Sequence, residues 1–405
     1  MWEEDAARRI SIFYAIISIS YAVQFIGVAL KLHQIGASGL VIGATYLLFN
    51  IAAMIGSIVA PRFLYHIYHV LTCISLILIA LSCYIIYIAE NPLMITIGFV
   101  LTGMFYSTLG PALTYLITRN RGDLKRGVII LTIPQNLGWS IGFLMGALSC
   151  MFTGVSTAIL LSSISVILAT PFSISIIREL RRVAKNRSVE VESEHKIEIL
   201  KRSMLMPYYV SVLLTFLAAS TFFTSLPPLL ATLGLTTYEI YFARFIGSVV
   251  ATLSYVFTIS SMIEKVSIVL HKISHFIIIR GIGFLLLLTA FYLHGVYLFI
   301  DASLILVLIG VTWSYLNTGI KVIVLNFGEE AHKIYGDTTF LICLGFIIGS
   351  FLGGALLDLN MYLIPIVSSS LAFIAAGSYM FASRKALISD MGSIITRSDP
   401  SPTRH

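Results

Sequence analysis

Twelve stretches of apolar residues, each about long enough to cross a lipid bilayer as a helix, run through this sequence of 405 residues. A hydrocarbon core of about 30 Å needs roughly 20 residues of helix. The stretches in the first half lie at about 10–31, 39–60, 70–89, 93–117, 127–149 and 155–177, and those in the second half at about 205–227, 238–260, 275–295, 302–323, 337–357 and 361–383. Uninterrupted apolar runs of this length predict helices, because the strands of membrane barrels alternate apolar and polar residues.

The scarcity of charge shows that the helices face lipid. Charged residues make up only 11% of the chain, and hydrophobic residues make up 58%. A soluble domain carries about 25% charged residues, so this chain cannot cover a surface that faces water. The composition therefore excludes a soluble enzyme, a disordered scaffold and a secreted domain held together by disulfides. It predicts an all-α membrane protein with twelve transmembrane helices.

The basic residues predict which ends of the helices face the cytoplasm. If the N-terminus is cytoplasmic, every Lys and Arg except Lys31 and Arg244 falls in or next to a cytoplasmic segment, as the positive-inside rule requires. Twelve spans place both termini on that side. We therefore predict a multi-pass protein of the plasma membrane with cytoplasmic N- and C-termini. The net charge of +7 follows from this topology, and its spread over many short loops argues against nucleic-acid binding.

One predicted cytoplasmic segment is much longer than the others and divides the spans six and six. Residues 178–203 carry charges of both signs, which is typical of a linker or a surface helix. The end of the chain is polar and rich in proline and serine, a composition that predicts disorder. The predicted organisation is a six-helix bundle over 1–177, a charged cytoplasmic linker over 178–203, a second six-helix bundle over 204–385 and a disordered cytoplasmic tail over 386–405.

A pattern of glycines recurs in the fifth span of each half. The two runs are Gly138, Gly142 and Gly146 in the first half and Gly345, Gly349 and Gly353 in the second, at a constant offset of 207 residues. Glycines four residues apart share one helix face and allow a neighbouring backbone to approach closely. Each run alone indicates only tight packing. Their equivalent positions indicate two bundles derived from a duplicated unit.

Three features together carry a resemblance to a known family. They are the six-plus-six layout with its long central loop, the segment GMFYSTLGPALTYLITRNRGDLKRGVIILTIPQNLGWSIGFLMGAL that begins at Gly103, and the run LICLGFIIGSFLGGALLD that ends at Asp358. In these features the chain resembles the major facilitator superfamily. The resemblance implies a secondary transporter, usually monomeric, that exposes a central site alternately to the two sides of the membrane. It also implies that spans 1, 2, 4, 5, 7, 8, 10 and 11 line the cavity.

The chain departs from three signatures of that family. Ala60 and Pro61 stand in the loop after the second span where an acidic residue is expected, and no arginine precedes Gly103 in the fourth span. Phe143 occupies the place where exporters carry a proline in the fifth span. The resemblance therefore leaves the coupling ion and the direction of transport open.

Charged residues inside a membrane are functional candidates by default. Arg244 lies about six residues into its predicted span, so it either snorkels to the outer face or lines a cavity, where it would bind an anionic solute or hold an outer gate closed. Arg280 and Lys321 lie near predicted inner boundaries and are interpreted as snorkelling. The acidic residues at span ends are interpreted as solvated: Glu90, Asp301, Asp337 and Asp358.

Uncharged polar residues lie closer to the middle of the spans. An amide in lipid needs a partner, so each one either bonds a neighbouring helix or binds the solute. Together with aromatic side chains, including Tyr21 and Tyr46, they would form a midplane site for a neutral or weakly polar solute. The candidate substrate-binding residues are Gln24, Asn50, Gln135, Asn136, Asn317, Arg244, Trp139 and Trp313.

The sequence gives little indication of an enzyme activity or of a cofactor. The zinc-peptidase motif HExxH and the phosphate-binding motif GxxxxGK[ST] do not occur, and two histidine pairs, His66/His69 and His271/His275, have no acidic companions for a metal. We expect no enzyme activity, no metal and no cofactor. The predicted function is secondary active or facilitative transport of a small solute, with proton or sodium as candidate coupling ions. The alternative is a membrane sensor or assembly protein that kept the fold but does not transport.

Overall fold

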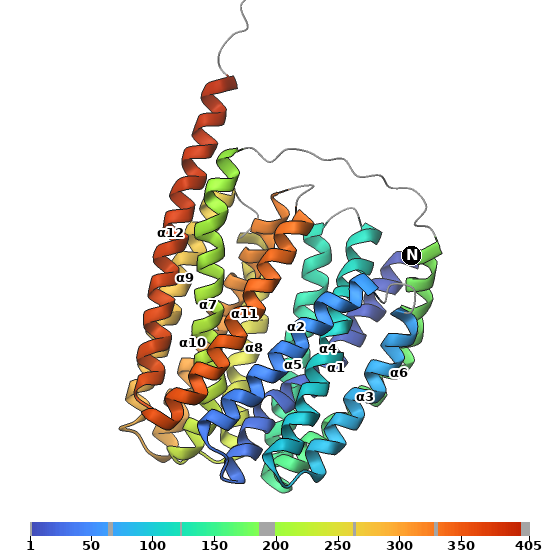
Figure 1. Cartoon of the computed structure of the whole chain (residues 1–405), viewed down its shortest axis with the longest axis vertical. Coiled ribbons are helices and arrows are strands. Elements are labelled where there is room, and N and C mark those ends of the chain that lie inside the picture. The colour runs from blue at the N-terminus through green and yellow to red at the C-terminus, as the bar shows by residue number, and fades with distance from the viewer. Residues whose placement is uncertain are drawn as a thin grey trace, which may run out of the picture.

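The computed structural model describes the backbone of residues 2–63, 68–121, 124–185, 199–261, 265–327 and 331–397. Within these residues the fold consists of twelve α-helices (Figure 1). Ten of the helices among them are long and apolar enough to cross a membrane, judged by length and composition. The prediction of an all-α membrane protein with twelve helices is confirmed.

The helices form two groups that each pack mainly against their own members. The N-terminal bundle contains α1 (Trp2–Gln34), α2 (Gly39–Phe63), α3 (Tyr68–Ile88), α4 (Pro92–Arg121), α5 (Leu124–Phe152) and α6 (Val155–Lys185). The C-terminal bundle contains α7 (Ile199–Thr232), α8 (Thr237–Ser261), α9 (Val266–Ala290), α10 (Gly295–Leu325), α11 (Ala331–Leu359) and α12 (Leu363–Arg397). The start of α1 and the end of α12 lie at one end of the molecule (Figure 1). We call this end the terminal side and the other end the opposite side.

The repeated glycines join α5 to α1 and α11 to α7. A Cβ atom on Gly142 would lie 2.5 Å from the carbonyl oxygen of Ile19, and one on Gly349 would lie 2.5 Å from the carbonyl oxygen of Leu217. Atoms cannot approach that closely, so only glycine fits at these positions. The same pairing of first and fifth helices in both bundles agrees with a duplicated unit.

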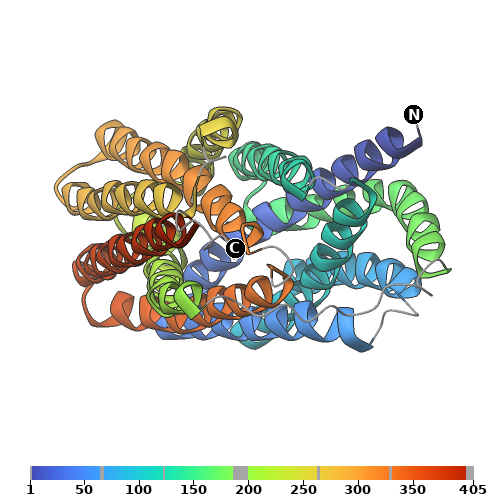
Figure 2. The ribbon, with the colours of Figure 1, turned by 90° about the horizontal axis from the view of Figure 1, so that it is seen from above.

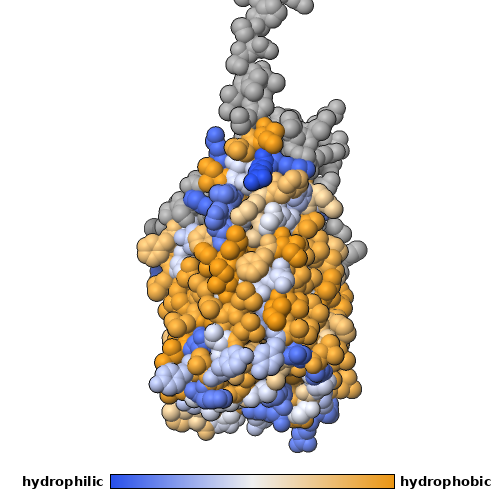
Figure 3. Space-filling view, turned by 90° about the vertical axis from the view of Figure 1, so that its left-hand side faces the viewer, coloured by the Kyte–Doolittle hydropathy of each residue, from blue (hydrophilic) through white to orange (hydrophobic). Residues whose placement is uncertain are grey.

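The outer surface of the molecule is built for lipid. Apolar side chains cover its middle, and hydrophilic side chains gather towards the two ends (Figure 3). Ile77 on α3 is 67% exposed and Val256 on α8 is 60% exposed. An apolar belt of this extent would cause a soluble protein to aggregate, and it fits a bilayer as the surrounding solvent.

Two predicted boundaries differ most from the structure. The span placed at 275–295 is α9, Val266–Ala290, which is followed by a turn at Phe291 and Tyr292. Gly295, whose φ of 55° suits glycine, begins α10. The apolar run continues through that turn, so hydropathy places the helix too late. The predicted disordered tail, 386–405, begins inside α12, which extends to Arg397. The linker centre, 186–198, and residues 398–405 lie outside the described residues.

Lys31, one of the two basic residues that break the charge rule, stabilises the end of α3. It is buried, and its Nζ donates hydrogen bonds to the carbonyl oxygens of Ile86 (2.5 Å) and Tyr87 (2.9 Å). These carbonyls lie in the last turn of α3, where no N–H group of the same helix reaches them. A cation at a helix C-terminus is also favoured by the helix dipole. Lys31 is therefore a structural cation with its own partners.

Candidate functional site

The two bundles meet along a seam formed by α1, α2 and α5 on one side and by α7, α8, α10 and α11 on the other. Figure 2 shows the bundles side by side in a view from the terminal side. Asn50 Nδ2 on α2 donates to Ser350 Oγ on α11 at 3.0 Å, and Ser140 on α5 bonds Ser248 on α8 at 2.8 Å. Most of the helices that the family resemblance implies for a cavity therefore lie at this seam.

The seam is closed on the opposite side by a contact between α2 and α11. Asp358 at the end of α11 accepts hydrogen bonds from the N–H groups of Gly39 (2.6 Å) and Leu40 (2.8 Å). It thereby caps the N-terminus of α2 from the other bundle. One turn deeper, Gly43 and Gly354 pack so closely that neither has room for a side chain. Asp358 is exposed, as predicted, but its carboxylate is bonded across the seam.

A second contact on the opposite side is made by α8. The Tyr241 side chain is buried, and its hydroxyl donates to the carbonyl oxygen of Val23 on α1 at 2.6 Å. Its ring fills the space beside Gly146 on α5, where a Cβ atom would lie 2.5 Å from the ring. The third glycine of the α5 run therefore packs against the other bundle, whereas Gly142 packs within its own.

Aromatic side chains of the N-terminal bundle gather around the predicted site residue Trp139. Its ring lies 5.2 Å from that of Tyr21 and 5.9 Å from that of Phe25, and Tyr21 stacks on Tyr106 at 4.4 Å. The indole Nε1 of Trp139 is buried, and its side chain interacts with the Tyr106 hydroxyl. A buried N–H group usually has an acceptor, and Tyr106 is the neighbour that provides one.

A polar cluster crosses the seam between α5, α8 and α10. Asn317 Nδ2 donates to the Tyr255 hydroxyl at 2.9 Å, and Asn136 also hydrogen-bonds this hydroxyl. Lys321 Nζ donates to Thr132 Oγ1 at 2.7 Å. The structure thus brings Asn136 and Asn317 together from opposite bundles. Lys321 bonds α5 across the seam, in place of the predicted snorkelling.

Gly138 to Gly142 also reads GxSxG, a pattern found at the nucleophile of many hydrolases. That chemistry needs the serine on a sharp turn between a strand and a helix. Ser140 instead lies inside α5, where its hydroxyl bonds Ser248 and Thr252 on α8 at 2.8 and 3.3 Å. The pattern serves helix packing at the seam.

Two arginines of the C-terminal bundle lie against one phenylalanine ring. The Cζ atom of Arg244 is 4.3 Å from the centre of the Phe223 ring, and that of Arg280 is 5.7 Å from the same centre and 5.0 Å from the Trp313 ring. Arg244 is half-buried, whereas Arg280 is 1% exposed. We call Phe223, Arg244, Arg280 and Trp313 the arginine cluster. It brings two predicted site residues, Arg244 and Trp313, to one place.

Gln24 and Gln135, the other predicted amides, have different surroundings. Gln24 is fully buried and is bonded only within its own bundle: its Oε1 accepts from Thr102 Oγ1 at 2.7 Å, and its Nε2 donates to Ser20 Oγ at 3.1 Å and to Cys83 Sγ at 3.2 Å. These partners lie on α1, α3 and α4, and they form hydrogen bonds with both the oxygen and the nitrogen of the amide. Gln135 is half-buried on α5.

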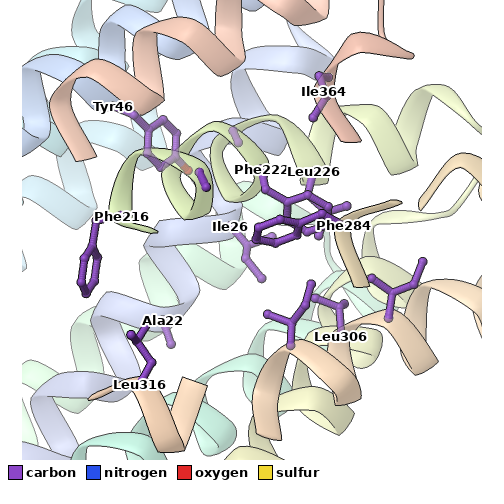
Figure 4. Packing of buried hydrophobic residues seen from close by; sticks show 14 of the residues in the cluster. Ala22, Ile26, Tyr46, Phe216, Phe222, Leu226, Phe284, Leu306, Leu316 and Ile364 are labelled. Atoms are coloured by element: carbon purple, nitrogen blue, oxygen red, sulfur yellow. The ribbon is translucent and has the colours of Figure 1, made fainter. Parts of the chain in front are cut away.

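Arg280 is the charged member of the cluster that the sequence interpretation missed. The late placement of the span put it near the terminal side, where snorkelling would explain it. Because α9 begins at Val266, Arg280 lies in the interior of the helix and is buried, so the predicted snorkelling is wrong. Its neighbour Phe284 stacks on Phe222 at 4.4 Å in the hydrophobic core (Figure 4). The glycine at position 295 was the signal that could have set the end of α9.

Comparisons with known proteins agree with this architecture. The chain is similar to the crystal structure of a mutant of the nucleoside transporter NupG, with a TM-score of 0.68 and 15% identity over 93% of this chain and 99% of that one. It is also similar to a bacterial homolog of the human lysosomal transporter Spinster in an inward-facing, unoccupied conformation, with a TM-score of 0.64 and 11% identity over 96% of this chain and 98% of that one.

Identities this low show a shared fold alone. No curated protein sequence matches the chain. A model of the Major Facilitator Superfamily, however, matches residues 10–350, which is most of the chain and spans both bundles. This protein belongs to the Major Facilitator Superfamily.

Proposed function

We propose that this protein carries a small solute across the plasma membrane by alternating access, as a secondary active or facilitative transporter. One observation carries the proposal: polar and aromatic side chains of both bundles converge at the centre of a seam whose opposite side is closed by direct contacts. In a carrier, the two bundles rock around such a centre and expose it to each side in turn. The terminal side is cytoplasmic in this proposal, because the predicted loops on that side hold most of the basic residues.

The energy source in this proposal is a gradient of the solute, of protons or of sodium. No Asp or Glu lies in the middle of any predicted span, and intramembrane carboxylates are common members of proton relays in transporters. This absence from the sequence favours solute exchange or facilitated movement over proton coupling. One chain holds both bundles, so a monomer is a complete transport unit.

The reactivity of single cysteines at the seam tests the proposal. In a background with the native cysteines replaced by alanine, Asn50→Cys and Asn317→Cys are expected to react with a membrane-impermeant maleimide added to either side of oriented proteoliposomes. Both positions are half-buried at the seam, and rocking exposes them to each side in turn. Gln24→Cys is the matched control, because Gln24 is 0% exposed inside one bundle and is expected to react from neither side.

Labelling of both seam positions from one side only would contradict alternating access. That outcome would support the sensor or assembly protein that shares the fold without transporting. The measurement needs no solute, so it is independent of what the protein carries.

A further inference from the structure

The two arginines of the arginine cluster have guanidinium groups without hydrogen-bond partners in the part of the chain that the structure describes. Among the described residues, none of the three guanidinium nitrogens of Arg280 has a hydrogen-bond partner, and neither do Nε and Nη2 of Arg244. Both side chains are permanently charged in proteins. Contact with aromatic faces offsets only part of the cost of burying a charge.

Among the described residues, the helices that hold the cluster and α2 and α5 across the seam supply no free carboxylate. The sequences of α7 and α9 contain no Asp or Glu, and neither do those of α2 and α5 across the seam. Glu239 on α8 accepts from the Thr236 N–H at 2.8 Å, and Asp301 on α10 accepts from the Thr289 hydroxyl at 2.9 Å. Both acids are therefore engaged near the ends of their helices. We infer that the charge that balances the arginines comes from outside the chain.

Two other cations in the predicted spans behave differently. Lys31 donates to two carbonyl oxygens at the end of α3, and Lys321 donates to the Thr132 hydroxyl. The chain thus provides acceptors where a cation is structural. The absence of acceptors at Arg244 and Arg280 sets the arginine cluster apart.

We propose that the transported solute is an organic anion, a carboxylate or phosphate group on an apolar body, and that its charged group binds at Arg244. This proposal rests on the proposed function and narrows it. Arg244 is half-buried on α8, one of the helices that form the seam. A guanidinium group pairs with a carboxylate or phosphate through two parallel hydrogen bonds.

The other members of the cluster have complementary roles in this proposal. Arg280 is enclosed and adds its positive charge from beside the Phe223 ring, so it positions the anion electrostatically without touching it. The rings of Phe223 and Trp313 suit the apolar body of the solute. An anion therefore replaces the neutral or weakly polar solute expected from the sequence.

Thermal unfolding of the solute-free protein tests whether the arginines are structural. Arg244→Met and Arg280→Met are expected to melt at or above the wild-type Tm, because an apolar side chain of similar length replaces a buried charge without removing a hydrogen bond. Lys31→Met is the matched control and is expected to lower Tm, since it leaves two carbonyls without their donor. A fall in Tm for Arg280→Met as large as for Lys31→Met would assign Arg280 a structural role and overturn its part in the proposal.

Binding of a matched acid and amide tests the charge of the solute. When Trp2 and Trp139 are replaced by phenylalanine, Trp313 is the remaining tryptophan, and its fluorescence reports events beside Arg280. Cyclohexanecarboxylate and cyclohexyl phosphate are expected to change this fluorescence saturably, whereas cyclohexanecarboxamide is not. Arg244→Gln is expected to weaken anion binding by about 10- to 100-fold, the range for a hydrogen bond to a charged group. Arg280→Gln is expected to weaken it less, by about threefold or more.

Several outcomes would overturn the anion assignment. They are equal binding of the acid and its amide, no response to either anion, and anion binding that Arg244→Gln leaves unchanged. The cysteine measurement separates this failure from failure of the carrier function. If the seam opens to each side in turn but the protein binds the amide more tightly than the acid, only the anion assignment is contradicted. If the protein binds anions but the seam does not open to both sides, only the carrier function is contradicted.

Discussion

Replacing Gly349 by leucine is expected to lower the free energy of unfolding by about 3 kcal/mol, at the upper end of the usual cost of overpacking. A Cβ atom there would lie 2.5 Å from the Leu217 carbonyl oxygen and 2.7 Å from the Ser220 Cβ atom. Both atoms belong to the closely packed α7, so the leucine forces α11 away from it. Gly142→Leu is expected to cost a similar amount, because α5 meets α1 in the same way. Thermal unfolding of the purified variants measures the loss.

Gly377→Leu provides the control for this prediction. Gly377 lies on α12, and a Cβ atom there would meet nothing within 4 Å. Leucine has a higher helix propensity than glycine, so this variant is expected to be as stable as the wild type or more stable by up to about 1 kcal/mol. Equal melting of Gly349→Leu and Gly377→Leu would contradict the packing of α11 on α7.

Replacing Asp358 by alanine is expected to open the opposite side of the seam. The change removes the carboxylate that caps α2 from α11, and a capping residue contributes about 1 kcal/mol. Part of this contribution is specific to the closed state, so the ratio of open to closed molecules is expected to rise severalfold, up to about tenfold. Spin labels at Phe152→Cys and Tyr292→Cys, exposed positions in different bundles on this side, measure the distance distribution.

Glu239→Ala is the matched control for Asp358→Ala. Glu239 is also an acidic residue at a helix start on the opposite side, but its carboxylate binds Thr236 within its own turn. Its removal is expected to leave the distance distribution unchanged. A response to Glu239→Ala as large as that to Asp358→Ala would show that loss of any local charge opens the seam, and it would contradict a specific α2–α11 gate.

The number of helices and the close packing of the fifth span in each half could be predicted, whereas the helix ends and the partners of those close contacts could not. Twelve apolar runs can be recognised because each helix must be long and apolar enough to cross the lipid. The glycine runs can be recognised because a helix contact without space for a Cβ atom requires glycine at every fourth residue. Hydropathy does not show where α9 ends. Residues Phe291 to Leu293 continue the apolar run of the helix before them, although Phe291 and Tyr292 form a turn and Gly295 begins α10.

The candidate site was predicted in part for a related reason. Hydropathy places a residue at a depth in the membrane but does not specify which neighbour its helix face meets. Asn136 and Asn317 meet on Tyr255 at the seam, whereas Gln24, at a comparable position in its span, bonds α3 and α4 inside one bundle. The role of Arg280 depended on the end of α9, so the error in that boundary hid the second charge of the arginine cluster.

Two distances between spin labels, one on each side of the molecule, test most directly whether the two bundles rock about the seam. Labels at Phe152→Cys and Tyr292→Cys report the opposite side, and labels at Asn120→Cys in α4 and Lys265→Cys before α9 report the terminal side. With Asp358→Ala added, the account predicts that the first distance lengthens while the second shortens. Two distances that stay unchanged, or that lengthen together, would contradict it.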